Sequence, residues 1–122
     1  MNGDKFFLDT NAIIILLQKG YEIPKKKYFF SIITEIELLS FPKLEIEEER
    51  LIKQALKNFK KININEKIKE YTVKIRKENL IKIPDALIIA SSIYKNAILV
   101  TNDKQLHKYT KCITIEELKD MD

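Results

Sequence analysis

The stretch Lys5-Phe6-Phe7-Leu8-Asp9-Thr10-Asn11 decides the fold of this chain. Its apolar residues, bounded by polar ones, favour a short buried strand, and the apolar spacing that resumes at Ile13 favours a helix. Asp9 would then stand at the carboxyl end of the strand, where open parallel α/β sheets hold their ligands. A second interpretation is that Asp9, Thr10 and Asn11 only cap the helix. Acids elsewhere in the chain decide between the two interpretations.

Length and residue usage limit the classes of protein to consider. The chain has 122 residues, which suits one domain over residues 1–122 with a single core. No apolar run approaches the length of a transmembrane helix, and the N-terminus does not resemble a signal peptide, so we expect a cytoplasmic protein without a membrane partner. One cysteine, Cys112, excludes a disulfide framework and a multi-cysteine zinc site. The sole histidine, His107, leaves little scope for imidazole chemistry.

The charge balance is moderately basic. The formal net charge is +4 and the isoelectric point is near 9.0, which is compatible with a polyanionic partner such as RNA but does not prove one. The two glycines, Gly3 and Gly20, belong to no phosphate-binding loop. The common nucleotide-binding motifs are therefore excluded.

Strands and helices are predicted to alternate along the chain. This alternation favours a parallel α/β sheet with helices on both faces. The predicted strands are 5–9, 28–31, 61–64, 97–101 and 111–114. The predicted helices are 10–19, 31–40, 45–59, 65–79, 84–96 and 115–121, with a short helical turn at 104–109.

The second informative stretch is Ser31-Ile32-Ile33-Thr34-Glu35-Ile36-Glu37-Leu38, a predicted helix capped near Ser31. Glu37 borders the apolar stripe of this helix, whereas Glu35 lies about 200° round the helix and points elsewhere. Most helical glutamates are ordinary surface acids, but the position beside the core makes Glu37 the better site candidate. We expect the inward face to comprise Ile32, Ile33, Ile36 and either Leu38 or Leu39.

The third stretch, Pro84-Asp85-Ala86-Leu87-Ile88-Ile89-Ala90, predicts a helix with Pro84 in its first turn. The helix dipole alone would favour an acid such as Asp85 there. The helix is otherwise unusually apolar, however, and an acid at its entrance would point into the protein. We therefore favour a site role for Asp85. The positions expected to be buried are Ala86, Ile89, Ala90 and Ile93.

The fourth stretch is Val100-Thr101-Asn102-Asp103, in which an apolar strand ends beside an acid. In a parallel sheet Asp103 would share an edge with Asp9, and helices flanking that edge could contribute Glu37 and Asp85. Clustered carboxylates raise one another's pKa unless a cation lies among them. Oxygen ligands without His or Cys suit Mg²⁺ or Mn²⁺, and water on such an ion could attack a phosphodiester.

The predicted site thus combines carboxylates with polar groups that orient them. Asp9 would anchor the metal ion, with Asp85 and Asp103 completing its shell. Glu37 would hold or deprotonate the attacking water. Nearby hydroxyl and amide groups could fix the carboxylates by hydrogen bonds. The carboxylates are Asp9, Glu37, Asp85 and Asp103, and the supporting residues are Thr10, Asn11 and Thr101.

The four stretches, in this order and spacing, resemble the acidic motifs of PIN-domain ribonucleases, and the chain length resembles that of VapC toxins of type II toxin–antitoxin modules. The resemblance implies a PIN-like three-layer sandwich with a five-stranded parallel sheet in the order 3-2-1-4-5. It also implies endonucleolytic RNA cleavage with Mg²⁺ or Mn²⁺, frequent homodimers and an antitoxin that covers the active site. Many relatives carry glycine or a basic residue soon after the second acid, whereas Leu38-Leu39-Ser40-Phe41-Pro42 follows here. The wall that faces the substrate is therefore left undefined.

Other functions fit the sequence less well. A haloacid-dehalogenase-type phosphatase needs a second aspartate two residues after the first, where this chain has Asn11. A non-catalytic PIN-like scaffold would normally have lost one or more acids, and all four are present. A PIN nuclease of RNA maturation stays open as an alternative. We predict a metal-dependent endoribonuclease, with a toxin as its biological role.

Overall fold

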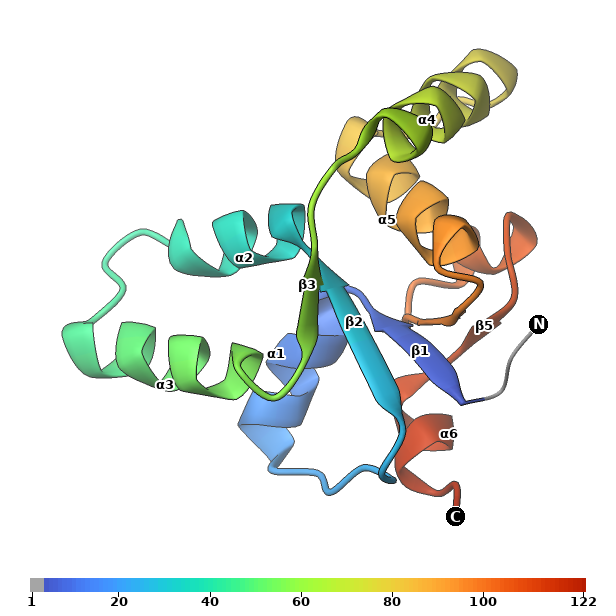
Figure 1. Cartoon of the computed structure of the whole chain (residues 1–122). Helices are drawn as coiled ribbons and strands as arrows, with labels where there is room; N and C mark the ends of the chain where they lie inside the picture. The colour runs from blue at the N-terminus through green and yellow to red at the C-terminus, as the bar shows by residue number, and fades with distance from the viewer. Residues whose placement is uncertain (1–3) are drawn as a thin grey trace.

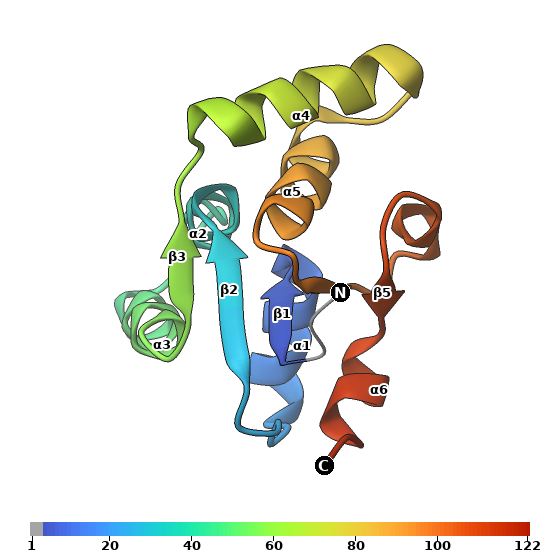
Figure 2. The same ribbon diagram turned by 45° about the vertical axis from the view of Figure 1, so that its right-hand side comes forward.

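The computed structural model describes residues 4–122 and has a parallel sheet between two helical layers (Figure 1). Its strands are β1 (Lys5–Leu8), β2 (Lys27–Ser31), β3 (Lys60–Ile62), β4 (Ile98–Val100) and β5 (Cys112–Ile113). They are hydrogen-bonded in the order β3-β2-β1-β4-β5, and each neighbouring pair is parallel. The arrowheads of β1, β2 and β3 point the same way in Figure 2. The predicted fold class and strand order are confirmed.

Helices connect the strands close to the predicted positions. Short polar side chains begin several of them: Ser31 accepts from the amide of Ile33, and Asn65 from that of Ile68. Gly20 ends the first helix in the left-handed region (φ 64°), where glycine carries no steric cost. The helices are α1 (Thr10–Lys19), α2 (Ile32–Leu39), α3 (Ile46–Leu56), α4 (Glu66–Glu78), α5 (Ile83–Tyr94) and α6 (Ile115–Lys119), with a 3₁₀ helix, η1 (Lys104–Lys108).

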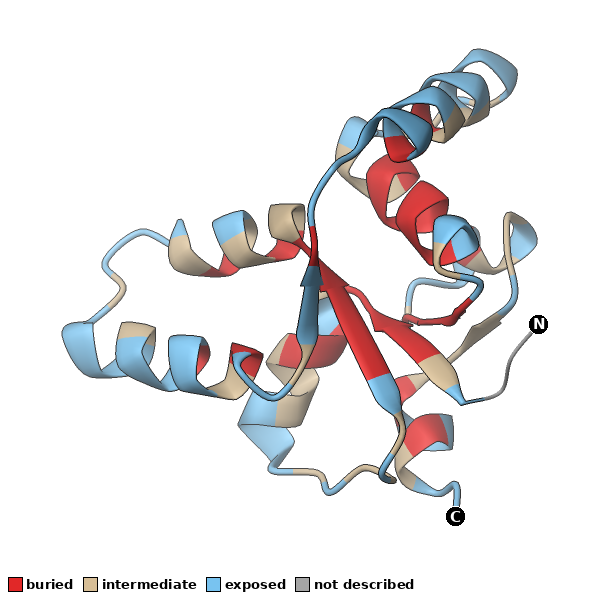
Figure 3. Ribbon diagram, in the orientation of Figure 1, coloured by how far each residue is buried: buried red, intermediate tan, exposed pale blue. Residues whose placement is uncertain are grey.

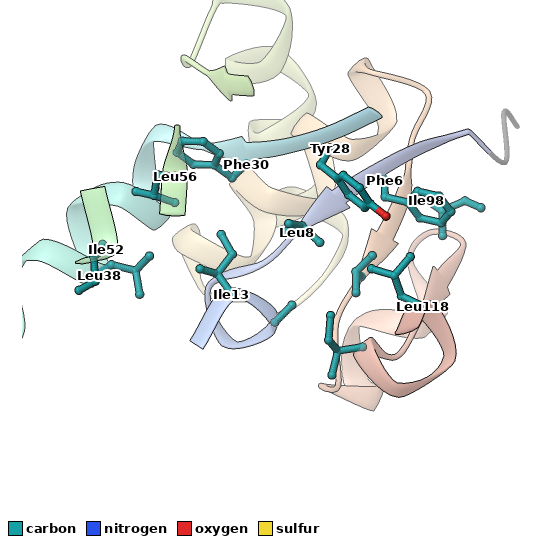
Figure 4. Packing of buried hydrophobic residues seen from close by; sticks show 13 residues of the cluster. Phe6, Leu8, Ile13, Tyr28, Phe30, Leu38, Ile52, Leu56, Ile98 and Leu118 are labelled. Atoms are coloured by element: carbon teal, nitrogen blue, oxygen red, sulfur yellow. The ribbon is translucent and has the colours of Figure 1, made fainter. Parts of the chain in front are cut away.

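Alternate residues of the central strand pack into opposite layers, as the period of a strand requires. Phe6 and Leu8 join a core cluster with α1, α2, α3 and α6 (Figure 4). Phe7 faces the other cluster, which includes residues of α4 and α5. Buried residues therefore fill the central strands and much of α5, whereas α3 and α4 are largely exposed (Figure 3).

The predicted inward face of α2 is wrong at Ile36, whose side chain is 53% exposed. The buried positions are Thr34 and Leu38, which lie one turn apart on the same side of the helix. Thr34 and Ile36 are about 200° apart round the helix, so burying one exposes the other. Several positions of this helix are apolar, and packing against α1, α3 and β2 decided which of them became buried.

Ile93 was also expected to be buried, and this prediction is wrong, since 44% of its surface is exposed. Ser91 and Ser92 are buried in its place. Their hydroxyl groups donate to the carbonyl oxygens of Leu87 and Ile89 at 2.7 and 2.8 Å, which removes the cost of burying them. Within residues 4–122 no helix has the length and apolar character needed to cross a membrane.

Truncation of a buried side chain in β1 tests whether this strand is the centre of the fold. Leu8 is fully buried, and Leu8→Ala is expected to lower the free energy of unfolding by about 2–5 kcal/mol because it leaves a cavity under α1. Chemical denaturation of both proteins measures the difference. Leu17→Ala on α1, where the side chain is 42% exposed, is the control and should cost clearly less. Equal losses at the two positions would contradict the central place of β1.

Candidate active site

Asp9 lies at the carboxyl edge of the sheet, directly after β1, and is 5% exposed. Its main-chain N–H donates to the carbonyl oxygen of Val100 at the end of β4 (3.2 Å). Its Oδ1 accepts from the amide of Ala12 at 2.7 Å and so caps α1. The hydrogen bond from Ala12 shows the capping role, and the same buried residue also lines a cavity.

The pKa of the Asp9 carboxyl is raised, and burial is the largest cause. Hydrogen bonds from the Thr101 hydroxyl and the Ala12 amide act in the opposite direction. The negative charges of Asp103 and Asp85 raise the pKa further. Asp9 is thus held in place by donors while two other carboxylates repel its charge.

Asp85 occupies the first turn of α5, next to Pro84 at the helix start, as predicted. Burial is again the largest cause of a raised pKa, followed by the charge of Asp103. Lys82 opposes this rise, and Glu37 adds to it. The carboxylates of separate elements are therefore close enough to affect one another's ionisation.

Glu37 is tied to the start of α1 by a hydrogen bond. The hydroxyl of Thr10 donates to Glu37 Oε1 at 2.7 Å, and the hydroxyl oxygens of Thr10 and Thr34 lie 3.0 Å apart. Thr34 is fully buried and was not among the predicted site residues. Thr34 lies three residues before Glu37, on the same side of the helix. This spacing in the sequence could have identified it as a residue of the site. Glu35 points away, as predicted, and pairs with Lys61 of β3 at 3.4 Å.

The segment after β4 links two of the acids through Thr101, which is fully buried. Its Oγ1 accepts from the amide of Asp103 at 3.1 Å, while its hydroxyl bonds the carboxylate of Asp9. Asp103 is exposed and caps η1 by accepting from the amide of Gln105. His107 makes a structural contact, with Nε2 lying 3.0 Å from the carbonyl oxygen of Thr101.

A cavity of about 230 Å³ opens among these residues. The structure brings three of the four predicted carboxylates round it, while Asp103 interacts with Asp9 and Asp85 by charge but does not line the wall. The helices α2 and α5 flank the carboxyl ends of the central strands in Figure 2. The polar lining is Asp9, Thr10, Asn11, Glu37 and Asp85, and the other lining residues are Ile14, Phe41, Pro84 and Ile88.

The chemistry of these donors fits a hard divalent cation. In the described part of the chain, no three Asp, Glu, His or Cys side chains are gathered closely enough to form a metal shell as they stand. The groups that converge are carboxylate oxygens that repel one another, and a cation would relieve this repulsion. Asp9, Glu37 and Asp85 could hold such an ion, and Asp103, whose charge acts on Asp9 and Asp85, could add a further ligand.

The chain is similar to known proteins in sequence and in structure. Residues 6–111 match the PIN domain family. No curated protein matches the sequence. A toxin–antitoxin complex from Klebsiella pneumoniae is 27% identical, with a TM-score of 0.68, over 83% of this chain and 88% of that chain.

Two further solved structures share the fold at lower identity. VapBC-1 from nontypeable Haemophilus influenzae has a TM-score of 0.74 and 21% identity, over 92% of this chain and 98% of that chain. DNA-bound VapBC from Salmonella typhimurium has a TM-score of 0.77 and 18% identity, over 91% of this chain and 98% of that chain. The structural neighbours are thus toxins of toxin–antitoxin complexes. Because the family match extends over residues 6–111, this chain belongs to the PIN domain family.

Proposed function

We propose that residues 1–122 act as one nuclease domain that cleaves RNA phosphodiesters internally and depends on Mg²⁺ or Mn²⁺. The observation that carries the proposal is the convergence of Asp9, Glu37 and Asp85 on one cavity, with the charge of Asp103 acting on Asp9 and Asp85. Membership of the PIN family, whose members are typically nucleases, supports the reaction class. The net charge of +4 is compatible with a polyanionic substrate.

Each residue of the site would have a separate role in the reaction. A bound Mg²⁺ or Mn²⁺ would supply positive charge opposite the scissile phosphate and lower the pKa of a bound water. Asp9, Asp85 and Asp103 would hold that ion. Thr101 keeps the Asp9 carboxylate oriented through its hydroxyl hydrogen bond, as Thr10 does for Glu37. Glu37 would accept the proton that the attacking water loses.

We further propose that the biological role is that of a VapC-like toxin. The similarity to the Klebsiella pneumoniae toxin–antitoxin complex extends over most of both chains and supports this role. A cognate antitoxin protein and a second copy of the chain are then the expected partners, the latter forming a homodimer. RNA would be the substrate.

Asp9→Asn is expected to lower RNA cleavage by roughly a thousandfold, because it removes a ligand charge that the reaction needs. The fold should persist, since an asparagine oxygen can still accept from the Ala12 amide and asparagine is a good helix cap. Cleavage of total cellular RNA by the purified protein with Mg²⁺ or Mn²⁺ measures the effect.

Glu35→Gln is the matched control, since Glu35 belongs to the same helix as Glu37 but pairs with Lys61. It should retain the activity of the unsubstituted chain. If Asp9→Asn cleaves RNA as fast as the unsubstituted chain, the observed cleavage does not come from this site.

Asp85→Asn is expected to raise the Tm at neutral pH in the absence of divalent ions. A raised pKa in the folded state means that Asp85 favours folding in acid and that this contribution is lost as the pH rises through that pKa. Asparagine is neutral at every pH, so the variant does not lose this contribution at neutral pH. In acid Asp85 is protonated and neutral as well, and the Tm values of the two proteins should become equal. Mg²⁺ should raise the Tm of the unsubstituted chain more than that of the variant. Thermal melts over a pH series test both points, and an equal Mg²⁺ effect would contradict a role for Asp85 in ion binding.

The toxin role predicts that expression of the chain arrests bacterial growth and that expression of Asp9→Asn does not. Growth curves after induction measure this difference. Co-expression of a short neighbouring reading frame should restore growth if it encodes the antitoxin. Harmless expression of an active enzyme would instead favour a PIN nuclease of RNA maturation. Harmless expression of a protein that cleaves no RNA would favour a non-catalytic scaffold.

A further inference from the structure

Phe41 is an exposed aromatic residue on the wall of the acidic cavity. It follows the end of α2, one turn beyond Glu37, and its side chain is 46% exposed. It lines the same cavity as Asp9 and Asp85.

The backbone on both sides of Phe41 restricts where the ring can lie. Pro42 follows it, and the residue before a proline is confined to extended conformations. On the other side, Ser40 ends α2 and its hydroxyl donates to the carbonyl oxygen of Ile36. The main chain that carries the ring is therefore restricted on both sides.

The cavity is lined by two chemically different kinds of side chain. Asp9, Glu37 and Asp85 contribute carboxylates, and Ile14, Phe41 and Ile88 contribute apolar surface. A nucleotide has the same division, because its phosphate is anionic and cation-binding whereas its base has an apolar π face. A phosphate placed near the carboxylates through a cation would leave the adjoining base beside the apolar surface.

A second, larger groove of about 690 Å³ also includes Phe41, together with Ile14, Leu17, Leu44 and Leu51. Phe41 could therefore be only a wall of that groove. Among the described residues that line either cavity, however, Phe41 alone is aromatic. Within residues 4–122 its ring also takes part in none of the ring–ring or cation–π contacts.

We propose that Phe41 stacks on the base next to the scissile phosphate, so that the site takes nucleotides whose bases are unstacked, in single-stranded or looped RNA. The inference rests on the proposed ribonuclease function and adds the residue that recognises the base. Stacking of a base on an aromatic side chain tolerates any sequence, since every base has a π face.

Kinetics of substituted proteins on a single-stranded RNA test this role. Phe41→Ala is expected to raise KM roughly 5- to 100-fold with little change in kcat, which is the usual effect of losing one stacked base. Phe41→Leu should raise KM as much as Phe41→Ala does, because leucine has no aromatic ring. Phe41→Tyr should keep KM close to that of the unsubstituted chain. The control is Leu51→Ala, since Leu51 is 49% exposed and lines only the larger groove. An unchanged KM in Phe41→Ala, or full rescue by leucine, would overturn the proposal.

Fluorescence gives a second readout that needs no cleavage. The chain contains no tryptophan, so Phe41→Trp in the Asp9→Asn background introduces a single indole. Titration with single-stranded oligoadenylate RNA should quench this fluorescence, and an abasic oligonucleotide of the same length should not. Leu51→Trp in the same background is the matched control and should not be quenched.

The outcomes separate this inference from the proposed function. Quenching by the RNA without any cleavage by the unsubstituted chain would keep Phe41 as a base-stacking residue and remove the ribonuclease proposal. Cleavage without quenching, while labelled RNA still binds the indole-containing variant, would keep the ribonuclease and overturn the stacking role. If the unsubstituted chain cleaves no RNA and the RNA does not quench the fluorescence, both the ribonuclease proposal and the stacking role of Phe41 are wrong.

Discussion

The parallel pairing of β1 with β4 is the constraint on which the site depends. Leu8 is in register with Val100, and the amide of Asp9 extends the pairing by donating to the Val100 carbonyl at 3.2 Å. Because the two strands run in the same direction, the residues that follow them leave the sheet at the same edge. Asp9 and Asp103 become neighbours for this reason, although they are far apart in the sequence. The helices α2 and α5 then add Glu37 and Asp85 from either side.

The same arrangement carries an electrostatic cost that hydrogen bonds only partly offset. Asp9 is almost fully buried, and its pKa is raised by that burial and by the charges of Asp103 and Asp85. Thr101 and Ala12 donate to it, and Thr10 donates to Glu37. A protein that needed only a helix cap would not gather several acids round it. Such a conflict between local stability and charge placement is typical of functional sites.

The strands and the acids that follow them could be predicted from the sequence because both depend on local patterns, whereas the strand order rested on the resemblance to the family. Short apolar runs followed by Asp9 or Asp103 indicate strands with an acid after their carboxyl end. This pattern can be read without knowledge of the rest of the chain. The buried face of α2 could not be predicted, because its apolar residues surround the helix and its packing against α1, α3 and β2 leaves Ile36 exposed. The bond from Thr10 to Glu37 joins residues 27 positions apart and depends on how α1 meets α2. The position of Asp103 beside the cavity, outside its lining, likewise depends on tertiary packing.

Binding of Mn²⁺ to the full chain tests the central claim most directly, namely that the acids at this sheet edge assemble to hold a divalent cation. The electron paramagnetic resonance signal of free Mn²⁺ reports the bound fraction during a titration. The account predicts saturable binding that weakens as the pH falls, because protons compete for carboxyls such as Asp9 and Asp85 whose pKa is raised. A free-ion signal that rises as it does in buffer alone, at neutral pH, would contradict the account.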